Sequence, residues 1–196
     1  MFGSAFNPPQ LAHLKVVEES RQQLGLDLVL IVPTGEAYHK QPDSNPGREV
    51  RFRMAEAAFS SSEGTIVCRF EIDREGPSFT YVTLEQIEQE NPDSELYLLM
   101  GADTARDFAG WKRPERILEL ARAAVVPRPG VKDEEVLRVF EDLSGSERLC
   151  LLEMSEAGVS SSEIRERIAS GLPVEDLVPT AVVEIIKNEE IYGSEH

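Results

Sequence analysis

Cysteine is scarce in this chain. Of its 196 residues only Cys68 and Cys150 are cysteines, and both lie in apolar, strand-like runs. That setting favours two buried, reduced thiols over a disulfide or a metal-binding pair. We therefore expect a cytoplasmic protein.

Long apolar runs are also missing. None reaches the ~18 residues that a membrane span needs, and no basic stretch followed by an apolar one marks a secretory leader. The chain is nevertheless 41% hydrophobic, as globular proteins are. Because no linker, repeat or low-complexity tract interrupts it, we expect one domain over residues 1–196.

Basic residues are few. Lys and Arg number 20 against 36 Asp and Glu, so the formal net charge is −16. This balance argues against a nucleic-acid partner, because phosphate contacts require many cationic side chains. The acidic residues are spread over many helical segments, which predicts a solvated surface rather than an acidic tail. Any phosphate site must be a local cluster of donors within a repulsive field.

Strand-like apolar runs alternate with segments of helical spacing. Strands are expected near 26–33, 65–70, 95–101, 123–127 and 149–153, and helices near 11–24, 48–60, 80–90, 114–121 and 133–143, with two more starting at 161 and 179. This alternation predicts an α/β fold with a Rossmann-like, doubly wound parallel sheet. Only two residues precede the first turn, so we expect a truncated first strand, either a stub or one whose native start lies upstream.

A turn of small residues leads into the first helix. Residues 3–6 (Gly-Ser-Ala-Phe) let a phosphate approach the backbone, residues 7–9 (Asn-Pro-Pro) interrupt regular structure, and helical spacing begins at Leu11. Free N–H groups and the positive end of the helix dipole would then point at one place. Gln10 and His13 share a face of the first helical turn, and both can donate to phosphate oxygens. The alternative is a surface turn that caps an ordinary helix.

A second candidate anion site lies near the other end of the chain. Ser160 and Glu163 have the S-x-x-E spacing of a capping box, which predicts a helix start with spare N–H groups. Arg165 can reach back over Ser161 and Ser162, because helical side chains lean toward the N-terminus. Hydroxyls, N–H groups and a guanidinium together suit an anion. The alternative is a capped surface helix with Arg165 in solvent.

The two strings together resemble the signatures of the nucleotidyltransferase superfamily. Gln10 stands where its first motif has His or Thr, Ala12 where it has Gly, and Val159 replaces Ile in its second. The resemblance narrows to bacterial nicotinate mononucleotide adenylyltransferases and covers nearly the whole chain. It rests further on residues 32–40, 51–54, 76–84, 98–103, 111, 125–130 and 177–179, and on Ile191-Tyr192 in the closing helix, with Val82 where an acid is usual.

This resemblance implies that ATP and nicotinate mononucleotide are the substrates and that deamido-NAD and pyrophosphate are the products, in NAD biosynthesis. The implied catalytic residues are His13, Gln10 and Arg165. The implied ATP-binding residues are Gly3, Ser4, Ala5, Phe6, Gly101, Asp103, Ser160, Ser161 and Ser162. The implied mononucleotide-binding residues are His39, Lys40, Arg51, Thr80 and Trp111. No residue is assigned to a metal.

Several of these residues have ordinary structural alternatives. For His39 and Lys40 the alternative is a solvated loop, which the matching residues around them oppose. Trp111, the only tryptophan, offers a stacking face for a pyridine ring or a half-buried lid over a neighbouring helix. Asp103 suits ribose hydroxyls or a helix N-cap. Thr80 suits the nicotinate carboxylate or, like Ser78, the cap of the following helix.

The chemistry needs no catalytic triad, and the sequence shows no Ser-His-Asp or Cys-His arrangement. The nucleophile is a phosphate monoester, which is mostly dianionic at neutral pH because its second pKa is ~6. In the reaction that the resemblance implies, it would attack the α-phosphorus of ATP and pyrophosphate would leave, and Mg²⁺ would bridge the leaving phosphates with few protein ligands. The protein has to align two anions and stabilise the spreading charge.

Gln10 is the main departure from the superfamily pattern. A Gln amide donates hydrogen bonds but carries no charge. If the superfamily histidine acts as a neutral donor, Gln10 replaces it at modest cost; if it acts as a cation, the loss is ~10²-fold. We predict that Gln10→His raises kcat in steady-state assays, and a clear fall would contradict this.

Two other functions remain open from the sequence. One is an adenylyltransferase that uses another acceptor, such as nicotinamide mononucleotide or phosphopantetheine. The other is a nucleotide-binding protein without turnover, acting as a sensor or scaffold, which the departures at Gln10, Ala12 and Val82 favour. Tight ATP binding without pyrophosphate release would distinguish the second from an enzyme.

Overall fold

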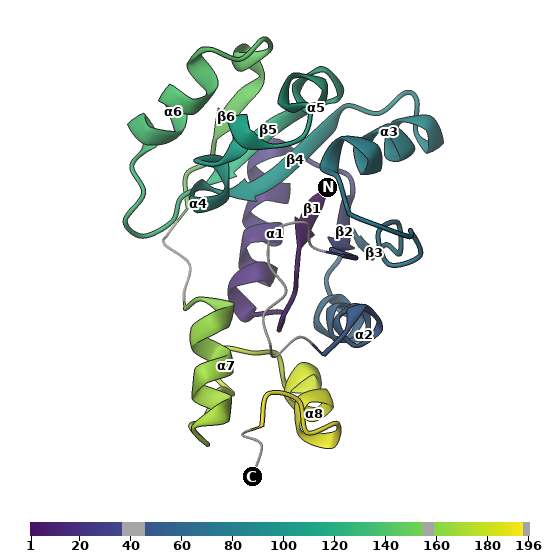
Figure 1. The fold of residues 1–196 in the computed structure, drawn as a ribbon, viewed down its shortest axis with the longest axis vertical. Coiled ribbons are helices and arrows are strands. Elements are labelled where there is room, and N and C mark those ends of the chain that lie inside the picture. The colour runs from purple at the N-terminus through teal and green to yellow at the C-terminus, as the bar shows by residue number, and fades with distance from the viewer. Residues whose placement is uncertain (37–45, 155–158, 194–196) are drawn as a thin grey trace. The chain divides into compact units, whose positions relative to one another are not determined.

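The computed structural model describes residues 1–36, 46–154 and 159–193, and these contain a six-stranded parallel sheet (Figure 1). The strands are β1 (Phe2–Ser4), β2 (Val29–Pro33), β3 (Thr65–Val67), β4 (Leu96–Gly101), β5 (Ala121–Val126) and β6 (Leu149–Leu151). They hydrogen-bond in the order β3-β2-β1-β4-β5-β6. Strand order therefore reverses beside β1, which confirms the predicted doubly wound α/β fold.

The helices follow the predicted order, with bounds that differ by a few residues. They are α1 (Leu11–Leu24), α2 (Arg48–Phe59), α3 (Thr80–Glu90), α4 (Ala102–Ala105), α5 (Pro114–Leu120), α6 (Asp133–Glu141), α7 (Ser161–Ala169) and α8 (Thr180–Asn188), with 3-10 turns η1 (Phe108–Gly110) and η2 (Ser146–Arg148). None of the described helices is long and apolar enough to cross a membrane. Gly25 ends α1 with a φ of 62°, a left-handed conformation that glycine adopts at little cost.

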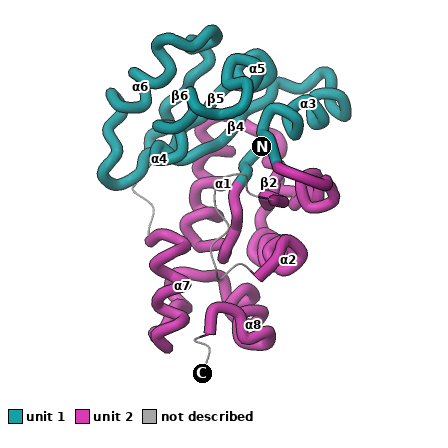
Figure 2. Tube along the Cα trace, in the orientation of Figure 1, with its two compact units in different colours: residues 1–3, 78–157 teal, residues 4–77, 158–196 magenta. Residues whose placement is uncertain are grey.

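The chain groups into two compact units, residues 1–3 with 78–157 and residues 4–77 with 158–196 (Figure 2). The single domain expected from the sequence stays a prediction. In the first unit, residues of β4 and β5 belong to a hydrophobic core that includes Met100, Phe108, Leu118 and Phe140. In the second unit Val29, Ile31 and Val32 of β2 are fully buried, as predicted for a strand covered on both faces.

The first strand is short. β1 has three residues, and within the first unit Phe2 pairs with Leu99 of β4. The Leu99 N–H donates to the Met1 carbonyl over 2.9 Å, and the terminal amine of Met1 donates to the carbonyl of Tyr97 over 2.7 Å. Backbone hydrogen bonds thus hold this strand in the sheet although it is only three residues long.

Several local expectations are wrong. α3 is capped by extended Phe79 rather than by Thr80 or Ser78, and α4 is capped by Gly101 rather than by Asp103. The cap is the last residue with non-helical dihedrals, and side-chain chemistry alone does not set its position. The free cysteines Cys68 and Cys150 are half-buried rather than buried, because one follows the edge strand β3 and the other lies in the edge strand β6.

Candidate functional site

The turn between β1 and α1, residues 3–10, is called the phosphate turn below. Gly3 and Ala5 are exposed, whereas residues 6–10 are buried. Phe6 has a φ of 47°, and its ring lies edge-on against His13 and Phe59, with centroids 5.2 and 5.8 Å away. The buried Phe6 side chain therefore anchors the turn while the backbone before it stays accessible to a ligand.

Arginine side chains from two helices bind carbonyl oxygens of this turn. Arg51 of α2 donates from Nη1 to the Ala5 carbonyl and from Nη2 to the Gly35 carbonyl, both over 2.8 Å. Arg165 of α7 donates from Nη1 to the Asn7 carbonyl, also over 2.8 Å. Because a peptide group is planar, fixing the Ala5 carbonyl also fixes the direction of the Phe6 N–H. The Asn7 carbonyl shares its plane with Pro8, which has no N–H, so Arg165 there fixes only the path of the chain.

Arg51 is almost completely buried, with 4% of its surface exposed. Burial lowers the pKa of its guanidinium, while Tyr192 and Glu71 act in the opposite direction. An arginine pKa is so high that the group stays charged. Arg51 was predicted to hold the mononucleotide phosphate; that role stays a prediction, and the contacts described here join the turn to the loop after β2.

His13 lies in the first turn of α1 with its ring orientation fixed by the backbone. The N–H of Gln10, the N-cap residue, donates to His13 Nδ1 over 3.1 Å. In a neutral imidazole the proton must then sit on Nε2. His13 can therefore offer Nε2–H as a hydrogen-bond donor, as phosphate binding requires.

The Gln10 side chain ties α1 to the start of α7. Its amide lies 2.6 Å from Ser161 Oγ. We assign the amide so that both atoms are satisfied: the oxygen accepts from the Ser161 N–H over 2.8 Å, and the nitrogen donates to the Val159 carbonyl over 2.9 Å. In this orientation Ser161 Oγ donates its one proton to the same amide oxygen over 2.6 Å. The two predicted anion sites are thus contiguous, and Gln10 joins them.

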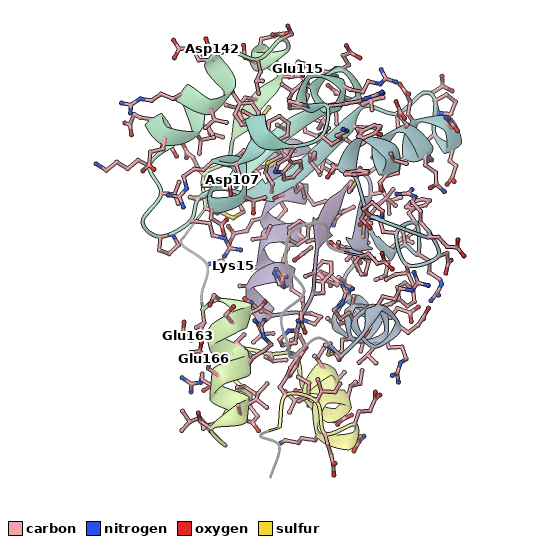
Figure 3. The ribbon with its side chains drawn as sticks, viewed as in Figure 1. Lys15, Asp107, Glu115, Asp142, Glu163 and Glu166 are labelled. Atoms are coloured by element: carbon pink, nitrogen blue, oxygen red, sulfur yellow. The ribbon has the colours of Figure 1, made fainter. Side chains whose placement is uncertain are left out.

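The start of α7 has the predicted geometry. Ser160 Oγ accepts from the Glu163 N–H over 3.2 Å, and Arg165 reaches back to donate from Nη2 to Ser162 Oγ over 3.1 Å. The alternative that leaves Arg165 in solvent is wrong, since its guanidinium binds both Ser162 and Asn7. Glu163 and Glu166 are exposed on the outer side of the same helix (Figure 3).

Asn7 and Tyr192 are site residues that the sequence did not reveal. The Tyr192 hydroxyl donates to Asn7 Oδ1 in the interior of the second unit. Burial raises the pKa of Tyr192, and the nearby charges of Arg165 and Arg51 partly oppose that shift. Tyr192 was assigned to the closing helix, but α8 ends at Asn188, so the tyrosine lies in the segment beyond it. The family resemblance includes Tyr192 but gives it no role, and only this long-range contact reveals one.

Two predicted residues of the first unit, Gly101 and Asp103, lie at the end of β4. Gly101 ends the strand, and a Cβ there would collide with Asp103 Oδ1 and lie 3.1 Å from Arg128 Nε. Asp103 Oδ1 lies 3.8 Å from that same nitrogen. A side chain at position 101 would therefore displace the exposed carboxylate of Asp103. Carboxyl ends of parallel strands are where ligands bind in such sheets.

Trp111 and Thr80 also belong to the first unit. Trp111 is half-buried, with its ring 5.3 Å from that of Phe108 at an angle of 45°. Thr80 is the half-buried first residue of α3. The predicted phosphate ligands His39 and Lys40 lie outside the described residues. In the described part of the chain, no group of three or more His, Cys, Asp or Glu side chains could hold a metal ion.

Comparison with known proteins identifies the family. The cytidylyltransferase-like family model matches residues 1–167. A "Probable nicotinate-nucleotide adenylyltransferase" of Roseiflexus sp. (strain RS-1) is 38% identical over 194 residues, which cover 98% of this chain and 96% of that protein. The chain belongs to the nicotinate-nucleotide adenylyltransferase family. A relative of the same name from Tropheryma whipplei (strain Twist) is 36% identical over 192 residues, or 98% of each chain.

Solved structures of other adenylyltransferases share the fold. A Plasmodium falciparum nicotinic acid mononucleotide adenylyltransferase complexed with NaAD aligns with a TM-score of 0.81 at 18% identity, over 97% of this chain and 95% of that one. The same enzyme complexed with APC aligns with a TM-score of 0.79 at 18% identity, over 97% and 94%. The family resemblance drawn from the sequence is confirmed, while the roles of the individual residues in this adenylyltransferase stay predictions.

Proposed function

We propose that this adenylyltransferase transfers the adenylyl group of ATP to nicotinate mononucleotide, forming deamido-NAD and pyrophosphate in NAD biosynthesis. Family membership supports the activity. The observation that supports the site is the junction of the phosphate turn with the start of α7, where Gln10 binds Ser161 and Arg165 binds Asn7. This junction gathers N–H groups, hydroxyls and a guanidinium, as a polyphosphate requires.

The triphosphate is assigned to this junction. His13 Nε2–H and the backbone of residues 3–6 hold the α- and β-phosphates. The hydroxyls of residues 160–162 and the Arg165 guanidinium hold the β- and γ-phosphates. Asp103, beside Gly101, accepts hydrogen bonds from the ribose of ATP. These groups favour the transition state because they face the oxygens on which negative charge increases.

The mononucleotide is assigned to the remaining predicted residues. Trp111 stacks on the pyridine ring through a face not packed on Phe108, and Thr80 binds near the nicotinate carboxylate. His39, Lys40 and Arg51 hold the mononucleotide phosphate. An oxygen of that phosphate attacks the α-phosphorus, the bond from this phosphorus to the bridging oxygen of the β-phosphate breaks, and pyrophosphate leaves. No general base is required, because the attacking phosphate is mostly a dianion.

Mg²⁺ fits this site as a companion of ATP. Mg²⁺ usually keeps several waters and takes phosphate oxygens as ligands, so few protein ligands are needed. Bound there, it neutralises charge on the leaving pyrophosphate. The hydroxyls of Ser161 and Ser162, which are assigned to the β/γ end, are the protein oxygens that would be offered to it.

Isotope transfer tests the proposed reaction. The protein is incubated with Mg²⁺, nicotinate mononucleotide and ATP labelled at either the α- or the γ-phosphate. We expect the α-label in a dinucleotide with the mass of deamido-NAD and the γ-label in pyrophosphate. ATP that binds while both labels remain in it would instead indicate a nucleotide-binding protein without turnover.

A further inference from the structure

The segment that follows α8 reaches the phosphate turn through one buried side chain. Tyr192 is 8% exposed, and its hydroxyl donates to Asn7 Oδ1. Arg165 already binds the carbonyl of the same asparagine. Asn7 is therefore held at two positions, its main chain from α7 and its side chain from the segment beyond α8.

The phosphate turn has few backbone N–H groups with which to form hydrogen bonds of its own. Pro8 and Pro9 have no backbone N–H, so two consecutive residues cannot donate hydrogen bonds within the turn. The carbonyls of Ala5 and Asn7 accept instead from Arg51 of α2 and Arg165 of α7. The geometry of such a turn depends on partners outside it, and Tyr192 is the partner of the Asn7 side chain.

The backbone of the segment beyond α8 sets the direction in which the Tyr192 side chain points. Glu190 and Tyr192 have φ values of 51° and 65°, in the left-handed region that residues other than glycine rarely adopt. The Ile191 N–H donates to the Ile186 carbonyl over 3.0 Å. Glu189, just before these residues, forms an exposed two-fold ion pair with Arg53 of α2 at 2.7 and 2.8 Å, which contributes little to holding the segment. Such backbone conformations persist where surrounding contacts determine them, and here they direct the Tyr192 hydroxyl inward.

We propose that Tyr192 is a positioning residue for adenylyl transfer, acting through Asn7 to hold the phosphate turn where its N–H groups meet the phosphates of ATP. The hydroxyl touches no substrate. It fixes the orientation of Asn7, and with it the peptide planes on either side. This inference rests on the proposed function, and small displacements of binding groups cost an enzyme much of its rate.

Tyr192→Phe tests the proposal because it removes only the hydroxyl and keeps the ring in place. We expect kcat/KM for ATP to fall about tenfold, with a higher KM for ATP and an unchanged KM for nicotinate mononucleotide. Glu189→Gln is the matched control: it breaks the exposed ion pair to Arg53 in the same segment, and such pairs contribute little. The control should keep both KM values and kcat.

A double variant shows whether Tyr192 acts through Asn7. Combined with Asn7→Ala, Tyr192→Phe should add little to the loss caused by Asn7→Ala alone, because neighbouring residues in one network are not additive. Independent, additive losses would overturn the proposal. So would wild-type kinetics in Tyr192→Phe, or equal losses in Tyr192→Phe and Glu189→Gln.

Two different measurements test the proposed function and the role of Tyr192. Wild-type turnover in the same assay tests the reaction itself. ATP affinity, measured by calorimetry without the second substrate, tests the role of Tyr192 even in a protein that does not turn over. Weaker ATP binding by Tyr192→Phe than by wild type and Glu189→Gln supports the proposal, and equal affinities overturn it.

Discussion

Arg165 links α7 to the phosphate turn through the Asn7 carbonyl and is assigned to the β/γ end of ATP. We predict that Arg165→Gln lowers kcat/KM by about 10²- to 10³-fold, the loss typical of one donor to developing negative charge. Arg165→Lys keeps the charge without the forked geometry, and its loss should be smaller. Steady-state kinetics with varied ATP measures both.

The neighbouring Arg167 provides the control for this variant. It lies on the same helix but donates to the Pro173 carbonyl instead of to the turn. Arg167→Gln removes the same charge from α7 and should leave kcat/KM close to wild type. Similar losses of kcat/KM in the two variants would mean that the overall charge of α7, and not the contacts of Arg165, determines the activity.

The hydroxyl of Tyr192 also affects stability as a function of pH. Burial raises the pKa of Tyr192 above the value of ~10 for an unfolded tyrosine. Above about pH 10 the unfolded chain therefore loses this proton while the folded chain keeps it, and stability falls as pH rises. Below about pH 10 the contribution is fully present.

Comparison with the phenylalanine variant isolates this effect. We predict that the free energy of unfolding of wild type minus that of Tyr192→Phe is constant from about pH 7 to pH 9 and shrinks above about pH 10. Urea unfolding of both proteins at a series of pH values measures the difference. A difference that stays constant to about pH 11 would show that the hydroxyl titrates normally in the folded protein.

At the scale of elements, α7 depends on its N-cap. Ser160 Oγ accepts from the Glu163 N–H, and replacing such a cap by alanine typically costs about 1 kcal/mol. For a chain of this size we predict that Ser160→Ala lowers the melting temperature by about 2–4 °C in calorimetry. Ser160→Asp keeps an acceptor at the cap and should restore it. An unchanged melting temperature in Ser160→Ala would show that other contacts hold the start of α7.

Sequence patterns predicted the elements where the signal is local. α1 runs from Leu11 to the stop at Gly25, and α7 starts after Ser160, because a glycine or a capping hydroxyl acts within one helical turn. Strand ends were less accurate. β2 begins at Val29, opposite Thr65 of β3, and exposed Leu28 stays outside it. Strand bounds depend on the partner strand, which local sequence does not contain.

The parts of the candidate site that depend on local motifs were predictable from the sequence, and the long-range contacts were not. The motifs located the phosphate turn and the start of α7, and a helical side-chain direction predicted that Arg165 reaches back. Local patterns could not show that Gln10 binds Ser161 or that Tyr192 binds Asn7. These contacts join residues more than a hundred positions apart, so only the folded chain reveals them.

At the scale of the whole molecule, the net charge of −16 opposes the binding of two anionic substrates. The Debye length, over which exposed charges still interact, is ~30 Å at 0.01 M salt but only ~10 Å at 0.1 M. Added salt should therefore remove repulsion from distant carboxylates before it weakens attraction by nearby groups such as Arg165.

We predict that kcat/KM for ATP rises when salt increases from about 0.01 to about 0.1 M. Stopped-flow or steady-state kinetics at constant free Mg²⁺ measures it, with potassium chloride as the added salt. A steady fall over this range would mean that the local cations dominate the field that ATP meets.

Parallel assays of pyrophosphate release test the central claim most directly. The wild-type protein is given ATP and Mg²⁺ with nicotinate mononucleotide in one reaction and nicotinamide mononucleotide in the other. The proposed function predicts release with the acid and much less with the amide. Release with the amide alone, or with neither from a folded sample that binds ATP, would contradict it.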